Sequence, residues 1–238
     1  MTRLIFIAAA ALAASACHAG AKEHDAGATV SRNYQVGAFD RIEVAGPYDV
    51  TVTTGGQPGV SAKGGEHLLD ETEVVVENGV LKIGSKHHSG FHIGWGHHGN
   101  AVFTVTTATL RGADIAGSGG VTVDKVNGDF KGAVAGSGDL QLAAVNGGAS
   151  EFSIAGSGKI RAAGKAQSAK MEIAGSGDID AAALATTDAD VSIAGSGNVR
   201  ANASGTAKVE IMGSGDVTVT GGAKCSISKA GSGNVTCG

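Results

Sequence analysis

The chain has 238 residues, a formal net charge of −4, 40 glycines, only 2 prolines and 4% aromatic residues. The negative balance leaves no basic footprint for a nucleic-acid partner. So much glycine with so little proline excludes a collagen-like chain and favours many tight corners.

The N-terminus is predicted to be a secretory signal peptide covering residues 1–19. Arg3 precedes an apolar run over residues 4–14, which is too short to span a bilayer, and small residues follow it. We therefore expect an exported protein, in the periplasm, in the outer membrane or at the cell surface.

Two processing routes for this signal stay open. The four residues that end at Cys17 form an imperfect lipobox, so that cleavage after Ala16 would leave Cys17 as a lipidated N-terminus. Ordinary cleavage near Ala19 would instead discard Cys17. Contact with a membrane is expected only through such a lipid.

The rest of the chain is interpreted as one β-rich domain behind a linker. Residues 20–30 are expected to form the flexible linker and residues 31–238 the domain. Within the domain, residues 31–109 are expected to form irregular N-terminal coils, with a histidine-rich loop at 85–99, and residues 110–238 to form a regular repeat.

The irregular part already contains strand patterns. Residues 42–52 match a later copy of the repeat, with Pro47 and Tyr48 in place of a Ser-Gly pair. An atypical copy is expected at the end of a repeat array, where one face has no neighbour. Further strand-like runs, separated by turns such as Asn78-Gly79, lie at 73–77, 80–83 and 101–106.

The loop at 85–99 is the one segment whose composition points to a ligand. It contains five of the eight histidines, namely His87, His88, His92, His97 and His98. Imidazole suits Zn, Cu and Ni, and a histidine-rich tract is a compositional pointer to metal. The spacing matches no defined metal site, so an exposed loop without a ligand is the alternative.

The second half of the chain is organised by the tripeptide Gly-Ser-Gly. Its seven copies start 18 to 20 residues apart, at Gly117, Gly136, Gly156, Gly175, Gly195, Gly213 and Gly231. Apolar and polar residues alternate on both sides of each copy, which is typical of half-buried strands, and the glycines allow a sharp turn. Each unit is therefore predicted to be a strand, a corner, a second strand and a looser return of about eight residues.

This period predicts an all-β, single-stranded parallel β-helix with one coil per repeat, because propeller blades and helical repeats are longer. A right-handed helix is favoured, since the coil length drifts between 18 and 20. One inward column is expected to consist of Ile115, Val134, Ile154, Ile173, Ile193, Ile211 and Ile227.

Two cysteines fall in the last repeat. Cys225 is aligned with Val209, and Cys237 with Val219, so both are expected to point inward. An oxidising compartment would allow them to form a disulfide, the alternative being two small buried thiols.

Three ordered segments resemble the bacterial head GIN domain family. They are residues 39–52, residues 76–83 and the repeated Gly-Ser-Gly followed by Asp or Asn and Val. The resemblance covers nearly all of the mature chain and implies an exported β-helical protein of the kind described as a "putative auto-transporter adhesin". It supplies no catalytic residues. The sequence departs from the family pattern at Met212, which replaces the alanine before the glycine.

Catalytic patterns are weak. The repeated serine has glycines as immediate neighbours, whereas a nucleophile elbow has them two residues away, so a ladder of turn hydroxyls is expected. The position after each tripeptide alternates aspartate with lysine or asparagine, which keeps carboxylates about 9.6 Å apart along the stack. The residues concerned are Gly120, Asp139, Lys159, Asp178, Asn198, Asp216 and Asn234.

These patterns favour a non-enzymatic protein of the cell envelope or surface, either adhesin-like or a scaffold. Its ligand, a protein or a glycan, and its oligomeric state are left open. One alternative is a periplasmic protein that binds a transition metal through the histidine-rich loop. A second is a β-helix that cleaves polysaccharides, which is disfavoured because the only tryptophan, Trp95, lies outside the repeats.

Overall fold

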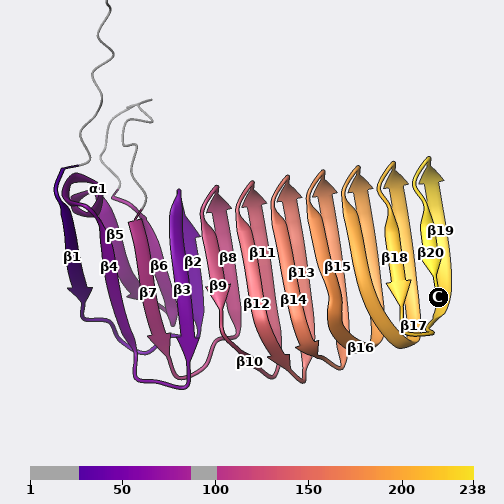
Figure 1. The fold of residues 1–238 in the computed structure, drawn as a ribbon, viewed down its shortest axis with the longest axis horizontal. Coiled ribbons are helices and arrows are strands. Elements are labelled where there is room, and N and C mark those ends of the chain that lie inside the picture. Colours follow the sequence, from indigo (N-terminus) through magenta and orange to yellow (C-terminus); the bar gives the residue numbers. More distant parts are fainter. Residues whose placement is uncertain (1–26, 87–100) are drawn as a thin grey trace, which may run out of the picture.

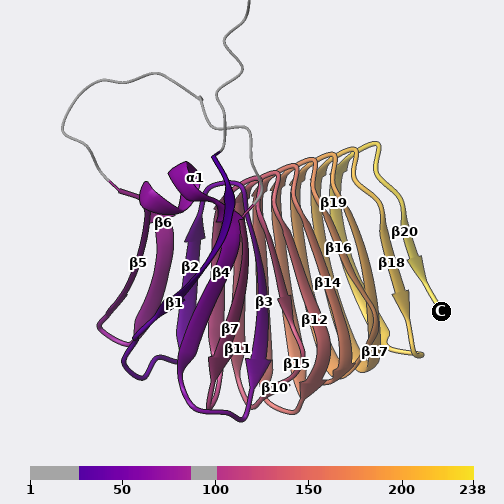
Figure 2. The same ribbon diagram turned by 60° about the vertical axis from the view of Figure 1, so that its left-hand side comes forward.

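The structure is a computed structural model that describes residues 27–86 and 101–238. Its strands stack along the long axis of the molecule as a parallel β-helix, which confirms the predicted fold class (Figure 1). Each coil has two sides of strands with an apolar core between them, as the rotated view shows (Figure 2). We call them the first side, which precedes the Gly-Ser-Gly corner, and the second side, which follows it.

The first side of the repeat coils begins with β8 and ends with β19. All neighbouring strands in it are parallel and in register. The strands are β8 (Gly112–Gly117), β11 (Phe130–Gly136), β13 (Ala149–Gly156), β15 (Ser168–Gly175), the last parts of β16 (Asp178–Gly195) and β17 (Asn198–Gly213), and β19 (Lys224–Gly231).

The second side is also parallel throughout. Its strands are β9 (Gly120–Val123), β12 (Asp139–Asn146), β14 (Lys159–Lys165), the first parts of β16 and β17, β18 (Val217–Thr220) and β20 (Val235–Cys237). A short strand, β10 (Val126–Asn127), pairs with the end of β12.

The return between coils is more regular than expected. β14 ends at Lys165 and the next first-side strand begins at Ser168, whereas β16 and β17 continue through the return without a break. Register shifts on the second side, such as the one between Leu142 and Val145, absorb the variation in coil length. The predicted loose return of eight residues is therefore wrong.

One column of branched apolar side chains runs through the core of the first side. Neighbouring strands align Ile115, Val134, Ile154, Ile173, Ile193 and Ile211 as predicted. All six are at most 2% exposed. Stacked coils of this kind bury their apolar surface continuously from one repeat to the next.

The prediction that Ile227 completes this column is wrong. Lys229 pairs with Ile211, whereas Ile227 pairs with Val209 and is 49% exposed. The last described coil has no further coil over it, so a lysine at the column position can reach out of the core. Its ammonium donates a hydrogen bond to the Gly233 carbonyl at 3.0 Å.

The corners are closed by backbone rather than by serine hydroxyls. The Ser176 amide donates to the Gly156 carbonyl at 2.8 Å, and equivalent bonds recur at other corners. Gly175 has a φ of +134°, and a Cβ there would lie 2.3 Å from the Gly156 carbonyl oxygen. Glycine is thus required for the coils to approach one another. The serines are exposed at the corners, so the expected hydroxyl ladder is replaced by one of amides.

The N-terminal region joins the stack out of chain order. β2 (Arg41–Ala45) and β3 (Tyr48–Thr54) form the coil that precedes β8 and β9, so residues 42–52 are a copy of the repeat as predicted. The expectation that this copy ends the array is wrong, because it has a neighbouring coil on both faces. On its other side this coil pairs with β6 (Val80–Ser85) and β7 (Ala101–Thr107), which come later in the sequence. The coil of β2 and β3 is therefore inserted between two coils that follow it in the chain.

Antiparallel strands cover the N-terminal end of the stack. β4 (Gly59–Gly65) pairs with β7, β1 (Thr29–Tyr34) pairs with β4, and β5 (Thr72–Glu77) pairs with β6 through the tight Asn78-Gly79 turn. Helix α1 (Glu66–Asp70) adds the buried side chains of Leu68 and Leu69. The first described strand begins at Thr29, two residues before the expected start of the domain.

A disulfide joins the two sides of the last described coil. Cys225 on β19 and Cys237 on β20 are linked, with their Cα atoms 6.6 Å apart. Cys237 pairs with Val219 as predicted, but Cys225 pairs with Ala207 and not with Val209. Cys225 is half-buried and Cys237 exposed, because the coil is open on its outer side.

Candidate functional site

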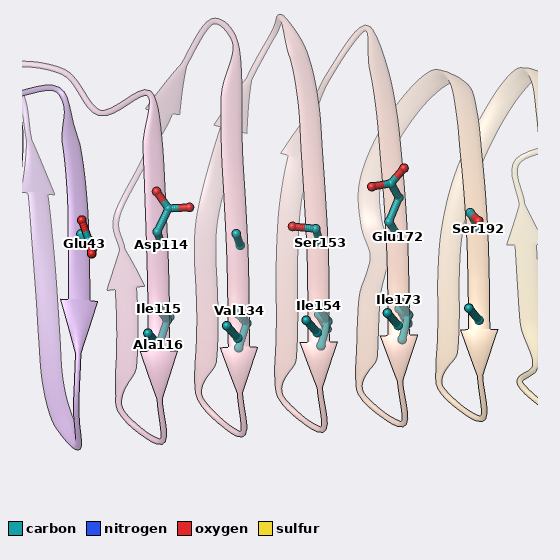
Figure 3. Close-up of a pocket in the computed structure, with 15 residues that line it drawn as sticks. Glu43, Asp114, Ile115, Ala116, Val134, Ser153, Ile154, Glu172, Ile173 and Ser192 are labelled. Carbon is teal, nitrogen blue, oxygen red and sulfur yellow. The ribbon is translucent and has the colours of Figure 1, made fainter.

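The first side carries a groove on its outer surface. The groove has a volume of about 660 Å³ and crosses the coils from the strand of Glu43 to that of Ser192 (Figure 3). Its lining comes from equivalent positions of successive strands, so the groove runs along the stacking axis of the coils. Outward residues at successive alternate positions form four rows along this face, which we call the return row, the charged row, the carboxylate row and the alanine row.

The alanine row forms the apolar part of the groove. It lies immediately before the corner glycines and consists of Ala45, Ala116, Ala135, Ala155, Ala174, Ala194, Met212 and Ala230, aligned strand by strand. Most of the row is a shallow methyl surface, because alanine projects little above the sheet. Met212, the next residue of the row after the groove-lining Ala194, has a side chain that is 68% exposed.

The carboxylate row borders the alanines. In Figure 3 the side chains of Asp114, Ser153 and Glu172 project along one line above the apolar residues. Glu43 and Asp114 are direct neighbours in register. Partial removal of water raises the pKa of Asp114 above its ordinary value, and repulsion by the Glu43 carboxylate adds to the rise, while nearby cations oppose it.

The charged row alternates in sign from coil to coil. Lys131, Glu151, Lys170, Asp190 and Lys208 are aligned across five successive strands, and all five are exposed. Lys131 contacts Glu151 at 3.2 Å. Lys170 and Lys208 each contact the glutamate two residues further along their own strands, at 2.8 Å in both cases. Among the described residues Asp190 makes no ion pair.

The return row lies next to the corner that starts the first side. Register aligns Ala149, Ser168, Asp188, Thr206 and Lys224, and the exposed Asp129 precedes Ala149 by one coil. A second hollow of about 610 Å³ lies between this row and the charged row. This hollow, like the groove, is therefore bounded by charged side chains.

The second side carries the ladder predicted at the position after each tripeptide. Lys159 lies 3.7 Å from Asp178, and the Asn198 side-chain amide donates to Asp178 at 2.9 Å. Further along, the Asp216 backbone amide donates to Asn198 at 3.2 Å, and that of Asn234 donates to Asp216 at 2.9 Å. Polar side chains here connect neighbouring coils, so this column has a structural role.

The remaining predicted site residues lie outside the described part of the chain. They are Cys17, His87, His88, His92, His97 and His98. In the sequence, the histidine-rich segment lies between β6 and β7, whose register places Ile83 opposite Val44 and Ala101 opposite Tyr48. Within residues 27–86 and 101–238, no three His, Cys, Asp or Glu side chains are grouped so as to hold a metal ion.

The sequence contained a signal for the groove that the analysis of motifs did not use. An alanine precedes the tripeptide in six of the seven copies, at Ala116, Ala135, Ala155, Ala174, Ala194 and Ala230. Alternation shows that this position faces outward, although it also belongs to the corner motif.

A comparison with protein-family models matches residues 38–223 to the family described as "Putative auto-transporter adhesin, head GIN domain". The chain belongs to this family. The match confirms the resemblance drawn from the three sequence segments. A comparison with curated proteins gives no match.

Several solved structures have the same fold. A "putative adhesin" from Bacteroides fragilis is 21% identical with a TM-score of 0.74, covering 88% of this chain and 97% of that one. A "putative lipid binding protein" from Parabacteroides distasonis is 24% identical with a TM-score of 0.69, covering 88% and 96%. A "putative adhesin" from Parabacteroides merdae is 20% identical with a TM-score of 0.68, covering 88% and 96%. Likeness at this level of identity shows the fold.

No helix within the described residues is long and apolar enough to cross a membrane.

Proposed function

We propose that this head GIN protein is a non-enzymatic component of the cell envelope, adhesin-like or a scaffold, that binds a partner through its first side. The observation that carries the proposal is the groove of about 660 Å³ along that side. Its apolar floor is continuous over several coils, whereas the outward face of the second side has a column of polar side chains that bind one another.

The lining of the groove supports binding rather than catalysis. It consists of alanine, serine, branched apolar and carboxylate side chains, and includes no histidine, cysteine or lysine. Identical positions repeated every coil provide a periodic surface, and concave or flat periodic surfaces are how repeat proteins bind their partners. The adhesin names within the family agree with this role.

Obstructing the groove tests the binding role. Ala155→Arg places a long cation on the floor of the groove, at an exposed position that leaves the core untouched. The labelled mature protein should bind to envelope fragments of the bacterium that produces it, and Ala155→Arg should weaken this binding at least about tenfold, since a desolvated charge is costly at an apolar contact. The control is Gln141→Arg on the exposed face of the second side, which should bind as the parent does. Equal binding by both variants would contradict the proposal.

Export is part of the same proposal, with two outcomes for anchoring. Mass spectrometry of the mature N-terminus should find either a lipidated Cys17 or a free N-terminus near Gly20. Retention of residues 1–16 in the mature protein, together with a location in the cytoplasm, would contradict the proposal.

A further inference from the structure

We propose that the partner of the first side is a second copy of this chain, docked face to face with its coils stacked in the opposite direction. The two copies would be related by a two-fold axis parallel to the strands. The inference rests on the proposed function in assigning a binding role to this face, and it adds the identity of the occupant.

The charged row is the first reason. Its alternation of lysine with glutamate or aspartate makes the row complementary to its own reversed copy, provided that the copies are offset so that opposite signs meet. In that register Lys208 of one copy faces Glu151 of the other, and Asp190 faces Lys170. The symmetry produces each contact twice. Asp190, which makes no ion pair within the described residues of its own chain, thereby gains one.

The return row gives an independent check of that register. The same offset places Lys224 of one copy opposite Asp129 of the other, and both are exposed. Neither residue forms a salt bridge within the described part of the chain, although Asp129 accepts a hydrogen bond from the Ala149 amide at 2.8 Å. Two rows with different sequences thus agree on one alignment.

Other alignments are worse. A shift by one coil places lysine against lysine and acid against acid along the charged row, which costs energy at an interface. A shift by two coils one way places Asp188 against Asp129 and Asp114 against Glu210. A shift by two coils in the opposite direction leaves a single kind of opposite-charge contact, between Lys208 and Asp190. The proposed register has the most opposite-charge contacts and no opposed like charges.

The two remaining rows fit the same register. Glu210 faces Ser153, and Glu172 faces Ser192, so a serine hydroxyl can donate to each carboxylate. In the alanine row, Met212 of one copy lies over Ala155 of the other. This exposed methionine, which lies next to the end of the groove in its own chain, would then fill the groove of its partner, and methionine adapts well to shallow apolar surfaces.

The size of the face is compatible with a stable contact. Six coils about 4.8 Å apart and a strand length of eight residues at about 3.3 Å each give a footprint of roughly 700 Å² per copy. Specific interfaces bury about 800 Å² per partner. The many charges predict a salt-sensitive dimer.

Sedimentation equilibrium of the mature chain tests the pairing. The chain should dimerise at low salt and dissociate as salt rises. Lys208→Glu and Glu151→Lys should each weaken the dimer at least about tenfold, and the double variant should regain affinity to within about threefold of the parent, because the swap restores both contacts. Arg200→Glu on the second side is the control and should not change dimerisation. A monomer at every concentration, or no rescue in the double variant, would overturn the inference.

A cross-link gives a second readout that does not depend on charge reversal. Met212→Cys combined with Ala155→Cys should form a dimer on mild oxidation. Within one chain these positions are three coils, about 14 Å, apart, which is too far for a disulfide. Pairing Met212→Cys instead with Gln141→Cys should give no cross-link. Equal cross-linking of the two pairs would overturn the proposed register.

Envelope fragments from cells that lack the protein separate this inference from the proposed function. The labelled chain should bind fragments that carry the native protein, and Lys208→Glu, which lies outside the groove lining, should abolish that binding. Binding to fragments without the protein that Ala155→Arg weakens would overturn the second copy as partner and leave the proposed function standing. Failure to bind either kind of fragment would overturn the proposed function.

Discussion

The repeat coils at residues 110–238 and the region before them form the same stack by different rules. In the repeat coils, each strand pairs with the strand one repeat further along, so stacking order follows chain order. In the earlier region, the coil of β2 and β3 is flanked by two coils that come later in the sequence. In the repeat coils, therefore, consecutive repeats in the sequence are also neighbours in the stack. In the earlier region, the strand pairings do not follow chain order and cannot be derived from local sequence patterns.

The ends of the stack differ in the same way. The N-terminal end is covered by antiparallel strands and the two buried leucines of α1, which change strand direction and so stop the addition of parallel coils. The C-terminal coil keeps the parallel geometry. Its inner positions are occupied by Lys229 and by the disulfide between Cys225 and Cys237. The N-terminal end is thus covered by strands that run in the opposite direction, whereas at the C-terminal end only the side chains of the last described coil differ from those of the inner coils.

The largest expected effect comes from breaking the core of the repeat coils. Ile173→Asp buries a carboxylate between Ile154 and Ile193 and should cost about 3 to 5 kcal/mol or unfold the repeat coils altogether. Circular dichroism and the unfolding midpoint measure it. Ala174→Asp, the outward neighbour on the same strand, should fold normally. An unchanged midpoint for Ile173→Asp would contradict the stacked-coil architecture.

The second effect compares the corners of the two regions. Gly175→Ala should lose about 2 to 3 kcal/mol, since its Cβ would lie 2.3 Å from the Gly156 carbonyl at a positive φ. Gly46→Ala, at the corner of the earlier coil, meets the Tyr48 ring instead and should lose less because a side chain can shift. Chemical denaturation of both variants gives the order. A larger loss at Gly46 would mean that the repeat corners are not the tighter ones.

The third effect concerns the C-terminal end. Reduction of the Cys225–Cys237 disulfide, which spans 12 residues, removes about 3 kcal/mol on the chain-entropy model. Because each coil contacts only its neighbours, the loss should appear as faster hydrogen exchange in β19 and β20, with β1 and β4 unchanged. Uniformly faster exchange along the whole stack would show that the ends are coupled.

A smaller effect is expected at the boundary between the regions, where Asp114 lies beside Glu43. A raised pKa in the folded state means that the protonated carboxyl is favoured there, so stability is lost as pH rises from the ordinary value of 3.8 through the higher pKa of the folded state. Asp114→Asn should therefore stabilise the protein at neutral pH, by at most about 1 kcal/mol because the carboxylate is largely solvated and screened. Thermal melts at acid and neutral pH check it, and destabilisation at neutral pH would contradict the sign.

The smallest expected effect on stability comes from the histidine-rich segment. Replacement of all five histidines by alanine should leave the unfolding midpoint unchanged, since none of them lies in the paired strands β6 and β7 on either side of the segment. Any binding of Zn, Cu or Ni should disappear in this variant and weaken below about pH 6, because only neutral imidazole coordinates metal. Calorimetry of the native chain without heat for any of the three metals would eliminate the metal-binding alternative.

Sequence reasoning predicted the features that repeat. The period of the Gly-Ser-Gly repeat predicted one coil per repeat. The alternation of apolar and polar residues predicted the inward column as far as Ile211, and the residues after each tripeptide predicted the polar ladder of the second side. The predictions for Ile227 and for the alignment of Cys225 are wrong. In every other coil the column residue lies two residues before the first glycine of the tripeptide, but two residues before Gly231 stands Lys229, and the nearest apolar residue is Ile227. A lysine is accepted at this position because the last described coil is open on its outer side, whereas in an inner coil its charge would be buried in the core.

The inserted coil and the groove could not be predicted in the same way. Placement of β2 and β3 depends on which strands pair over long sequence separations, and local patterns do not encode this. The groove needs the exposed rows of several coils to be aligned at once. Met212 illustrates the point: in the sequence it is only a departure from the family pattern, yet its exposed side chain lies next to the groove-lining Ala194.

Labelling of the two faces on intact cells tests most directly the claim that the first side is the binding surface. Ala194→Cys lies on the alanine row and Thr218→Cys on the exposed face of the second side. On cells, a maleimide should react quickly with Thr218→Cys and slowly with Ala194→Cys, whereas both should react quickly in the dilute purified chain. Equal protection of the two positions on cells, or protection of Thr218→Cys alone, would contradict the account.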